Sequence, residues 1–180
     1  MYDLKSLADA ITLLRGGLAV LFIWLGAYGG RESLPAAALL LVLCWTGDFV
    51  DGGLARRSRR YRHTWIGDHD LEFDVFVSLC LGIYLTLAGY VSLPWALGYA
   101  AIWLFILSLA GRSQALLNLV QALIYAAMII QALVDALPAG LVLVGWILAA
   151  LVIKRERFVH QVVPEFLQDI QQAWHSAQHR

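Results

Sequence analysis

Long apolar runs separated by short polar joints dominate this chain. Six runs approach the roughly 20 residues that an α-helix needs to cross a bilayer, near 11–30, 34–53, 72–92, 94–110, 114–134 and 138–153. The runs are continuous rather than alternating, which favours helices over barrel strands. The pattern therefore predicts an all-α integral membrane protein with six transmembrane helices.

The C-terminal segment has a different pattern. From residue 154 onward, apolar side chains recur every four residues, at Phe158, Val162, Phe166, Ile170 and Trp174. This spacing predicts an amphipathic helix at the cytoplasmic interface or against the bundle. We therefore expect two regions, a six-span membrane domain at 1–153 and an interfacial tail at 154–180.

The composition excludes an ordinary soluble domain, because 61% of the residues are hydrophobic and only 14% are charged. Cys44 and Cys80 lie in apolar runs and are expected to be core residues, not a disulfide or a zinc site. No cleavable signal pattern precedes the first run, so we expect that run to stay in the protein. We expect no nucleic-acid partner.

The basic residues predict an orientation. In a six-span arrangement, twelve of the thirteen Lys and Arg residues fall on one side and only Arg31 on the other. The positive-inside rule then places both termini in the cytoplasm.

An acidic window interrupts the apolar pattern. Asp48 and Asp51 stand three residues apart at the end of the second run, and Asp70 and Asp74 stand four apart at the start of the third. Both spacings put the two carboxylates on one face of a helix. Because the connection is short, two antiparallel helices would bring all four carboxylates to the same depth.

Four carboxylates this close repel one another unless a cation offsets their charge. Oxygen ligands without His or Cys favour Mg²⁺ or Mn²⁺, and two such ions about 3.5–4 Å apart would suit a diphosphate substrate. Alternatively, the carboxylates pair with nearby arginines in a structural network. Gly52 and Ala55 would let a ligand, or another helix, approach closely, and Arg56 is placed to meet a phosphate.

The segments "DFVDGGLAR" at 48–56 and "DLEFD" at 70–74 resemble the signature of the CDP-alcohol phosphotransferase family, D-x2-D-G-x2-A-R followed by G-x3-D-x3-D. The first half matches at every fixed position. "TLLR" at 12–15 is similar to the T-x-x-R common in the first span of that family. The resemblance extends over roughly 9–153.

The resemblance implies a metal-dependent membrane enzyme of phospholipid biosynthesis. Such an enzyme moves a phosphatidyl group from a CDP-linked donor, here CDP-diacylglycerol, to a small polar alcohol and releases CMP. Asp74 corresponds to the base that deprotonates the acceptor. The implied ligands of the two metal ions are Asp48, Asp51, Asp70 and Asp74. The implied contacts to CDP are Gly52, Ala55 and Arg56.

The second half of the motif departs from the family pattern, since two residues instead of three separate Gly67 from Asp70. An alternative register would use Asp68 and Glu72, which also stand four residues apart.

The acceptor is not identified by the sequence. Glycerol 3-phosphate is preferred because it is the commonest bacterial acceptor in the family, and Arg112 either binds a phosphorylated acceptor or only sets topology. Three polar residues of the fifth run either line the acceptor pocket or bond neighbouring helices: Gln114, Asn118 and Gln121. The resemblance also implies a homodimer, with membrane lipids as further partners. The expected location is a bacterial inner membrane, with the site facing the cytoplasm.

Two other classes stay open. A divalent-cation transporter would also use intramembrane carboxylates, although its ligands are expected near the middle of the membrane. A non-catalytic structural relative is the second alternative, and the irregular second half of the motif favours it.

Overall fold

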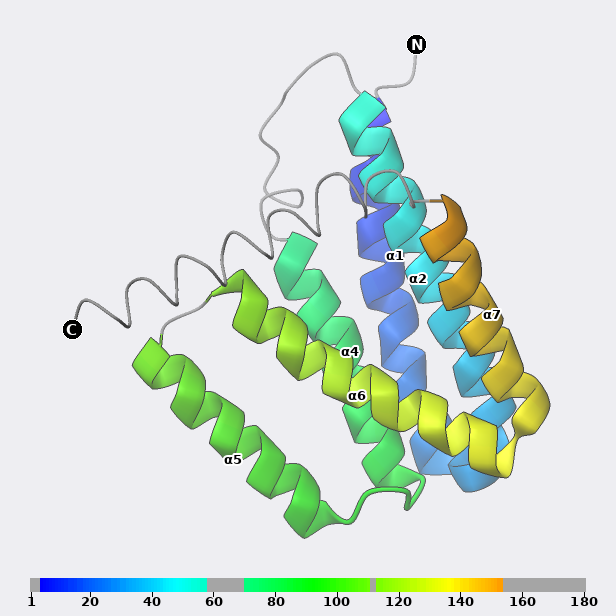
Figure 1. Cartoon of the computed structure of the whole chain (residues 1–180), viewed down its shortest axis with the longest axis vertical. Coiled ribbons are helices and arrows are strands. Elements are labelled where there is room, and N and C mark those ends of the chain that lie inside the picture. Colours follow the sequence, from blue (N-terminus) through cyan, green and yellow to red (C-terminus); the bar gives the residue numbers. More distant parts are fainter. Residues whose placement is uncertain (1–3, 58–69, 111–112, 154–180) are drawn as a thin grey trace. The chain divides into compact units, whose positions relative to one another are not determined.

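The computed structural model describes residues 4–57, 70–110 and 113–153, with side chains over 6–51, 71–109 and 113–153. Within these ranges every regular element is a helix (Figure 1), so the all-α class is confirmed. The predicted amphipathic tail at 154–180 lies outside the described residues.

The first two helices form a hairpin. Helix α1 (Leu4–Trp24) leads through a π-helical turn, η1 (Leu25–Gly29), and a 3₁₀ turn, η2 (Gly30–Ser33), into α2 (Leu34–Arg57). Gly30 has a φ of 52°, a conformation that favours glycine. The Ser33 hydroxyl lies 2.7 Å from the Gly30 carbonyl oxygen and 3.1 Å from that of Leu25. These contacts hold α1 and α2 side by side.

Four further helices follow: α4 (Asp70–Leu87), α5 (Leu93–Ala110), α6 (Gln114–Asp135) and α7 (Leu137–Ile153). Pro94 and Pro138 occupy the first turns of α5 and α7, where the missing N–H costs nothing. At the start of α6, the Ser113 hydroxyl accepts a hydrogen bond from the backbone N–H of Leu116, a normal N-cap.

The α1–α2 turn also contacts the loop after α4. The guanidinium of Arg31 donates to the Gly89 carbonyl at 2.7 Å and lies 5.0 Å from the centre of the Tyr90 ring. Arg31 is exposed, so this is a surface contact at the end of the bundle where α1 ends.

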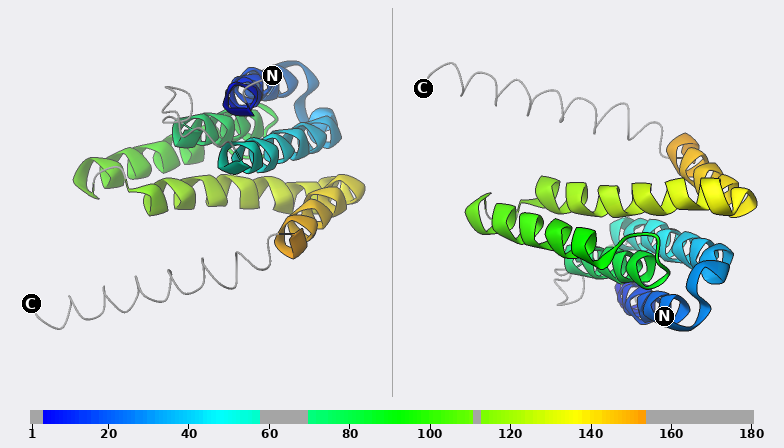
Figure 2. Two further views of the ribbon diagram at one scale, coloured as in Figure 1. Left: turned by 90° about the horizontal axis from the view of Figure 1, so that it is seen from above. Right: turned by 90° about the horizontal axis from the view of Figure 1, so that it is seen from below.

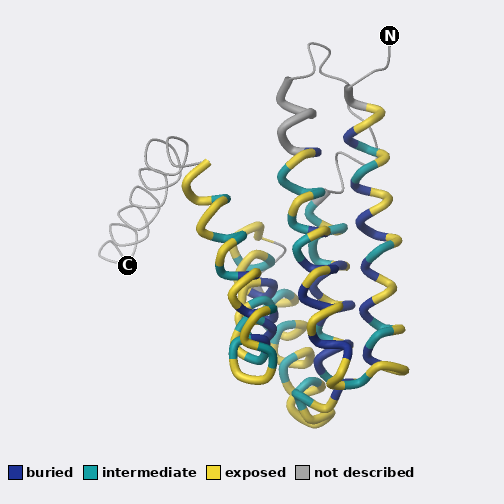
Figure 3. The backbone as a smooth tube through the Cα atoms, turned by 90° about the vertical axis from the view of Figure 1, so that its right-hand side faces the viewer, coloured by how far each residue is buried: buried dark blue, intermediate teal, exposed yellow. Residues whose placement is uncertain are grey.

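The chain divides into two compact units, Met1–Leu143 and Val144–Arg180. In the first unit, α1, α2 and α4 pack together, and α6 lies along α4 and also contacts α2 (Figure 2). Buried residues follow the facing sides of these helices (Figure 3). The most deeply buried residues include Ala19, Phe22, Ala37, Ala38, Leu41, Cys44, Val77, Cys80, Leu81, Tyr84 and Met128. Cys44 and Cys80 are free and buried, as predicted. The predicted domain boundary at residue 153 stays a prediction.

The prediction of six transmembrane helices is wrong. Only two stretches of the described chain, Ser6–Asp51 and Gln114–Asp135, are long and apolar enough to cross a membrane. Helix α7 has 17 residues and covers about 25 Å at 1.5 Å per residue, less than the roughly 30 Å of a hydrocarbon core. The apolar part of α5, Leu93–Leu109, is similarly short. Helix α4 has three acidic residues among its first five.

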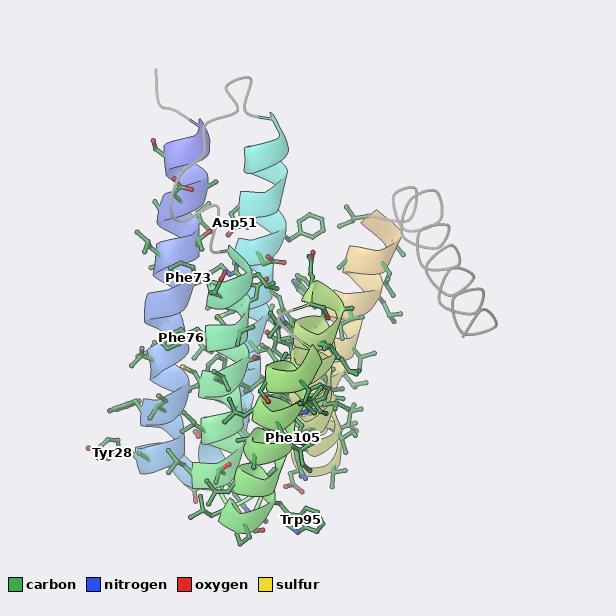
Figure 4. All side chains as sticks on the ribbon, turned by 90° about the vertical axis from the view of Figure 1, so that its left-hand side faces the viewer. Tyr28, Asp51, Phe73, Phe76, Trp95 and Phe105 are labelled. Atoms are coloured by element: carbon green, nitrogen blue, oxygen red, sulfur yellow. The ribbon has the colours of Figure 1, made fainter. Side chains whose placement is uncertain are left out.

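These two stretches still indicate association with a membrane. Large apolar side chains are also exposed on α5, among them Trp95 and Phe105 (Figure 4). Exposed apolar surface of this kind marks a contact with lipid or another protein. The prediction that both termini lie in the cytoplasm depended on an even number of spans. Because the predicted count of six is wrong, that prediction loses its basis.

Candidate functional site

Three helices bring a group of polar residues to one end of the first unit. Thr12 and Arg15 stand three residues apart on α1, Asp48 and Asp51 three apart near the end of α2, and Asp74 one turn into α4. Since α1 and α2 are antiparallel, the start of α1 meets the end of α2. Figure 4 shows Asp51 at this end of α2, beside α1. We call these five residues the carboxylate cluster.

Arg15 is the centre of the carboxylate cluster. Its Nη1 lies 3.4 Å from Oδ1 of Asp48 and 3.1 Å from Oδ2 of Asp51, and its Nη2 donates to Oδ1 of Asp74. The Arg15 side chain is only 5% exposed. One buried guanidinium therefore joins carboxylates from two other helices, and the planar fork of arginine suits such shared contacts.

Thr12 lies one turn before Arg15 on α1, and its hydroxyl contacts the same carboxylate of Asp51. Its hydroxyl oxygen lies 3.0 Å from Asp51 Oδ2 and 3.3 Å from the Ala8 carbonyl oxygen. A hydroxyl has only one hydrogen to donate, and the charged, nearer carboxylate is the stronger acceptor. Oδ2 of Asp51 thus accepts from both Thr12 and Arg15.

The three carboxylates differ in their access to solvent. The side chain of Asp51 is 4% exposed, that of Asp74 27% and that of Asp48 44%. Asp51 is therefore the interior anchor of the carboxylate cluster, while Asp48 and Asp74 lie on its accessible side. A ligand that approaches the cluster reaches those two first.

The described geometry bears on metal binding in two ways. Within the described residues, no group of three His, Cys, Asp or Glu is arranged to hold a metal ion, because three carboxylate oxygens face the guanidinium instead. However, Oδ1 of Asp51 is buried and has no hydrogen-bond partner among the described residues. A buried carboxylate oxygen without a partner is costly, and it fits a cation ligand.

The other predicted site residues are placed less completely. Asp70 is the first residue of α4, and Gly52, Ala55 and Arg56 continue α2 beyond Asp51, but their side chains are outside the described set. Arg112 lies outside the described residues altogether. The structure therefore places Asp70, Gly52, Ala55 and Arg56 on their helices without describing their contacts.

The alternative register of the motif is described only in part. Asp68 lies outside the described residues, and Glu72 is exposed on α4. Asp74, two residues further along the same helix, contacts Arg15. Of Glu72 and Asp74 on α4, Asp74 is therefore the residue whose described contacts join it to the carboxylate cluster.

Sequence reasoning missed two features of this site. It treated Arg15 as part of a family resemblance and expected the carboxylates to pair with metals or with arginines near the membrane surface. It also did not single out the aromatic pair that Trp45 of α2 and Tyr125 of α6 form against the core. The ring of Tyr125 lies edge-on to Trp45, with centroids 5.4 Å apart. The spacing of Thr12 and Arg15 on one helical face was the available signal for the first feature.

A glycine of α2 makes room for Arg15. A Cβ added at Gly47 would lie 2.7 Å from Cδ and 2.8 Å from Cγ of Arg15, closer than real carbon atoms approach. We expect Gly47→Ala to displace the arginine stem and to lower the stability by about 1–3 kcal/mol, as overpacking does. The matched control is Gly17→Ala on α1, where an added Cβ meets nothing within 4 Å. Thermal unfolding in detergent compares the two, and a Gly47→Ala variant as stable as Gly17→Ala would contradict this packing.

No protein-family model matches this chain, and neither does a curated protein or a solved structure.

Proposed function

We propose that this chain is a membrane enzyme that transfers a phosphatidyl group from a CDP-linked lipid to a small polar alcohol and releases CMP. The observation that supports it most is the meeting of Asp48, Asp51 and Asp74 at one point. These residues come from two helices and are three of the four acidic positions of a motif that resembles the CDP-alcohol phosphotransferase signature. Carboxylates gathered beside an apolar bundle would suit a phosphate-bearing substrate at a membrane surface through bound divalent cations.

The proposed reaction is a displacement at phosphorus. The hydroxyl oxygen of the acceptor bonds to the phosphorus that carries the lipid alcohol, and the bond from that phosphorus to the oxygen of CMP breaks. Asp74 accepts the proton of the hydroxyl. Its partial exposure gives an acceptor access to the carboxylate, whereas Asp51 is too deeply buried for this role. Positioned proton acceptors of this kind contribute about 10²–10⁴-fold to a rate.

The proposed cofactor is Mg²⁺ or Mn²⁺, as two ions. Asp48, Asp51, Asp70 and Asp74 are the residues that would hold them, and the fit depends on the buried, unpartnered Oδ1 of Asp51. Bound divalent cations offset the charge of a diphosphate and of the departing CMP.

The nucleotide of the donor is proposed to bind along α2. Gly52 and Ala55 follow Asp48 and Asp51 by four residues each, and α2 continues as a helix through these positions. They therefore continue the helical stripes of the two carboxylates by one turn. A stripe of small residues lets a ligand approach the backbone, and Arg56 adds a cation for phosphate.

The acceptor is proposed to be a small phosphorylated alcohol. Glycerol 3-phosphate is the preferred acceptor, and Arg112 is the candidate cation for its phosphate. Membrane lipids and a second copy of this chain, in a homodimer, are the further proposed partners, on the basis of the family resemblance alone.

The proposed location is a bacterial inner membrane with the carboxylate cluster facing the cytoplasm. The sequence from 56 to 62 holds five arginines, at Arg56, Arg57, Arg59, Arg60 and Arg62. The first two are the last residues of α2, on the end of the helix that carries Asp48 and Asp51. Because Lys and Arg accumulate in cytoplasmic loops, this end of the helix is expected on the cytoplasmic side.

The test is release of CMP by the purified full-length protein. We expect CMP from CDP-diacylglycerol and Mg²⁺ only when an acceptor is added, with glycerol 3-phosphate the most effective of a panel that includes serine and inositol phosphate. EDTA should abolish release. No CMP with any acceptor would overturn the enzyme and favour a transporter or a structural protein, which Mg²⁺ flux into proteoliposomes would separate.

A further inference from the structure

Asp51 differs from the other carboxylates of the cluster in how its two oxygens are used. Oδ2 accepts from Thr12 at 3.0 Å and from Arg15 at 3.1 Å. Oδ1 is buried and has no partner among the described residues. The whole residue is 3% exposed, so bulk water does not supply a hydrogen bond to Oδ1. The carboxylate is thus fixed through one oxygen and left open through the other.

The two donors to Oδ2 are themselves rigidly placed. Thr12 is 4% exposed and Arg15 is 4% exposed, and both lie on one face of α1. Threonine has a β-branched side chain with few rotamers. The guanidinium of Arg15 is also held by Asp48 and Asp74. Two donors from a neighbouring helix therefore restrict rotation of the Asp51 carboxylate.

Groups that hydrogen-bond a metal-ligating side chain from outside fix its orientation and raise the affinity for the metal. From the unequal use of its oxygens, we infer that Thr12 and Arg15 are positioning residues that orient Asp51 so that Oδ1 is presented to a divalent cation. The inference rests on the metal part of the proposed function. It gives the first helix a specific task in a site whose acidic residues all come from α2 and α4.

Thr12 offers the sharper test because its removal changes no charge. Thr12→Val keeps the shape and loses the hydroxyl, whereas Thr12→Ser keeps the hydroxyl and loses a methyl group. The matched control is Thr86→Val on α4, where the hydroxyl donates to the Gly82 carbonyl four residues earlier, at 2.9 Å. The hydroxyl of Thr12 likewise lies near a carbonyl four residues earlier, that of Ala8, so the control reproduces the loss of a helical hydroxyl that has no carboxylate partner.

The measurement is the affinity for Mn²⁺, followed by electron paramagnetic resonance of free Mn²⁺. The full-length protein is placed in nanodiscs of phosphatidylcholine, because anionic lipids attract cations. We expect Thr12→Val to weaken Mn²⁺ binding about 10–100-fold, as loss of such an outer partner does elsewhere. Thr12→Ser and Thr86→Val should bind within about 3-fold of wild type, well below that range. If Thr12→Val does not fold, Thr12→Ala replaces it.

Three of the four contrary outcomes separate the inference from the proposed function. Equal binding by Thr12→Val and wild type would overturn the inference and leave the enzyme proposal intact. Equal weakening in Thr12→Val and Thr12→Ser would also overturn it, because Thr12→Ser keeps the hydroxyl and the effect would then not depend on it. A wild-type protein that binds no Mn²⁺ would overturn both the inference and the metal-dependent function. Mn²⁺ binding without CMP release would overturn the function and leave the positioning role standing.

Discussion

Replacing Asp74 by asparagine should reduce CMP release at least about 100-fold, the lower end of what a positioned base contributes. The substitution keeps the size of the side chain and removes the charge that accepts the proton and helps to hold a metal ion. The fold should survive, because Arg15 retains Asp48 and Asp51 as partners. The initial rate with CDP-diacylglycerol, Mg²⁺ and glycerol 3-phosphate measures the effect, and thermal unfolding checks the fold.

The matched control is Glu72→Gln, on the same helix α4 and exposed. It makes the same chemical change two residues away and should leave the rate nearly unaltered. A Glu72→Gln variant that loses activity while Asp74→Asn keeps it would contradict the proposed role of Asp74. It would favour the register that uses Asp68 and Glu72.

Replacing Arg15 by methionine should destabilise the protein strongly. Methionine fills a similar length but carries no charge, so Asp51 would remain buried without the cation that it contacts in the structure. Removal of one partner from a buried ion pair costs about 3–5 kcal/mol. At about 2–4 °C per kcal/mol for a chain of this size, Tm should fall by about 6–20 °C. Thermal unfolding of the full chain in detergent measures this.

Arg31→Met is the control for the loss of an arginine. Arg31 is exposed and contacts Gly89 and Tyr90 at the other end of the bundle, and contacts of this kind contribute about 1 kcal/mol or less. If the cluster binds metal, Mn²⁺ should restore part of the Tm of Arg15→Met and not that of Arg31→Met. Equal losses of Tm in the two variants would show that Arg15 does not hold the carboxylate cluster together.

The helices were largely predictable because their signals are local. Apolar runs and their polar joints located elements such as α2, expected from residue 34 and observed as Leu34–Arg57, and α6, expected near 114–134 and observed as Gln114–Asp135. The membrane count failed for a reason that is also local. A run such as 138–153 has the hydrophobicity of a span, but the described helix there, Leu137–Ile153, covers only about 25 Å, less than the roughly 30 Å of a hydrocarbon core.

The candidate site was predictable in part. The spacing of Asp48 and Asp51 required a shared helical face, and their distance from Asp74 along the chain allowed the end of α2 and the start of α4 to meet. The structure joins these three residues through Arg15. The positions of Asp70, Gly52, Ala55 and Arg56 on their helices agree with those expectations, while their side-chain contacts stay predictions.

The sequence alone determined the all-α class, the positions of the helices and the pairs of acidic residues that share a face, because each depends on residues within one or two turns. Only the tertiary structure decided that Arg15 meets all three carboxylates and that Asp51 is held through Oδ2 with Oδ1 left open. These features depend on how α1 faces α2 and α4. That packing is set by the shapes of distant surfaces, such as the space that Gly47 leaves for Arg15, and helical periodicity along the chain does not encode it.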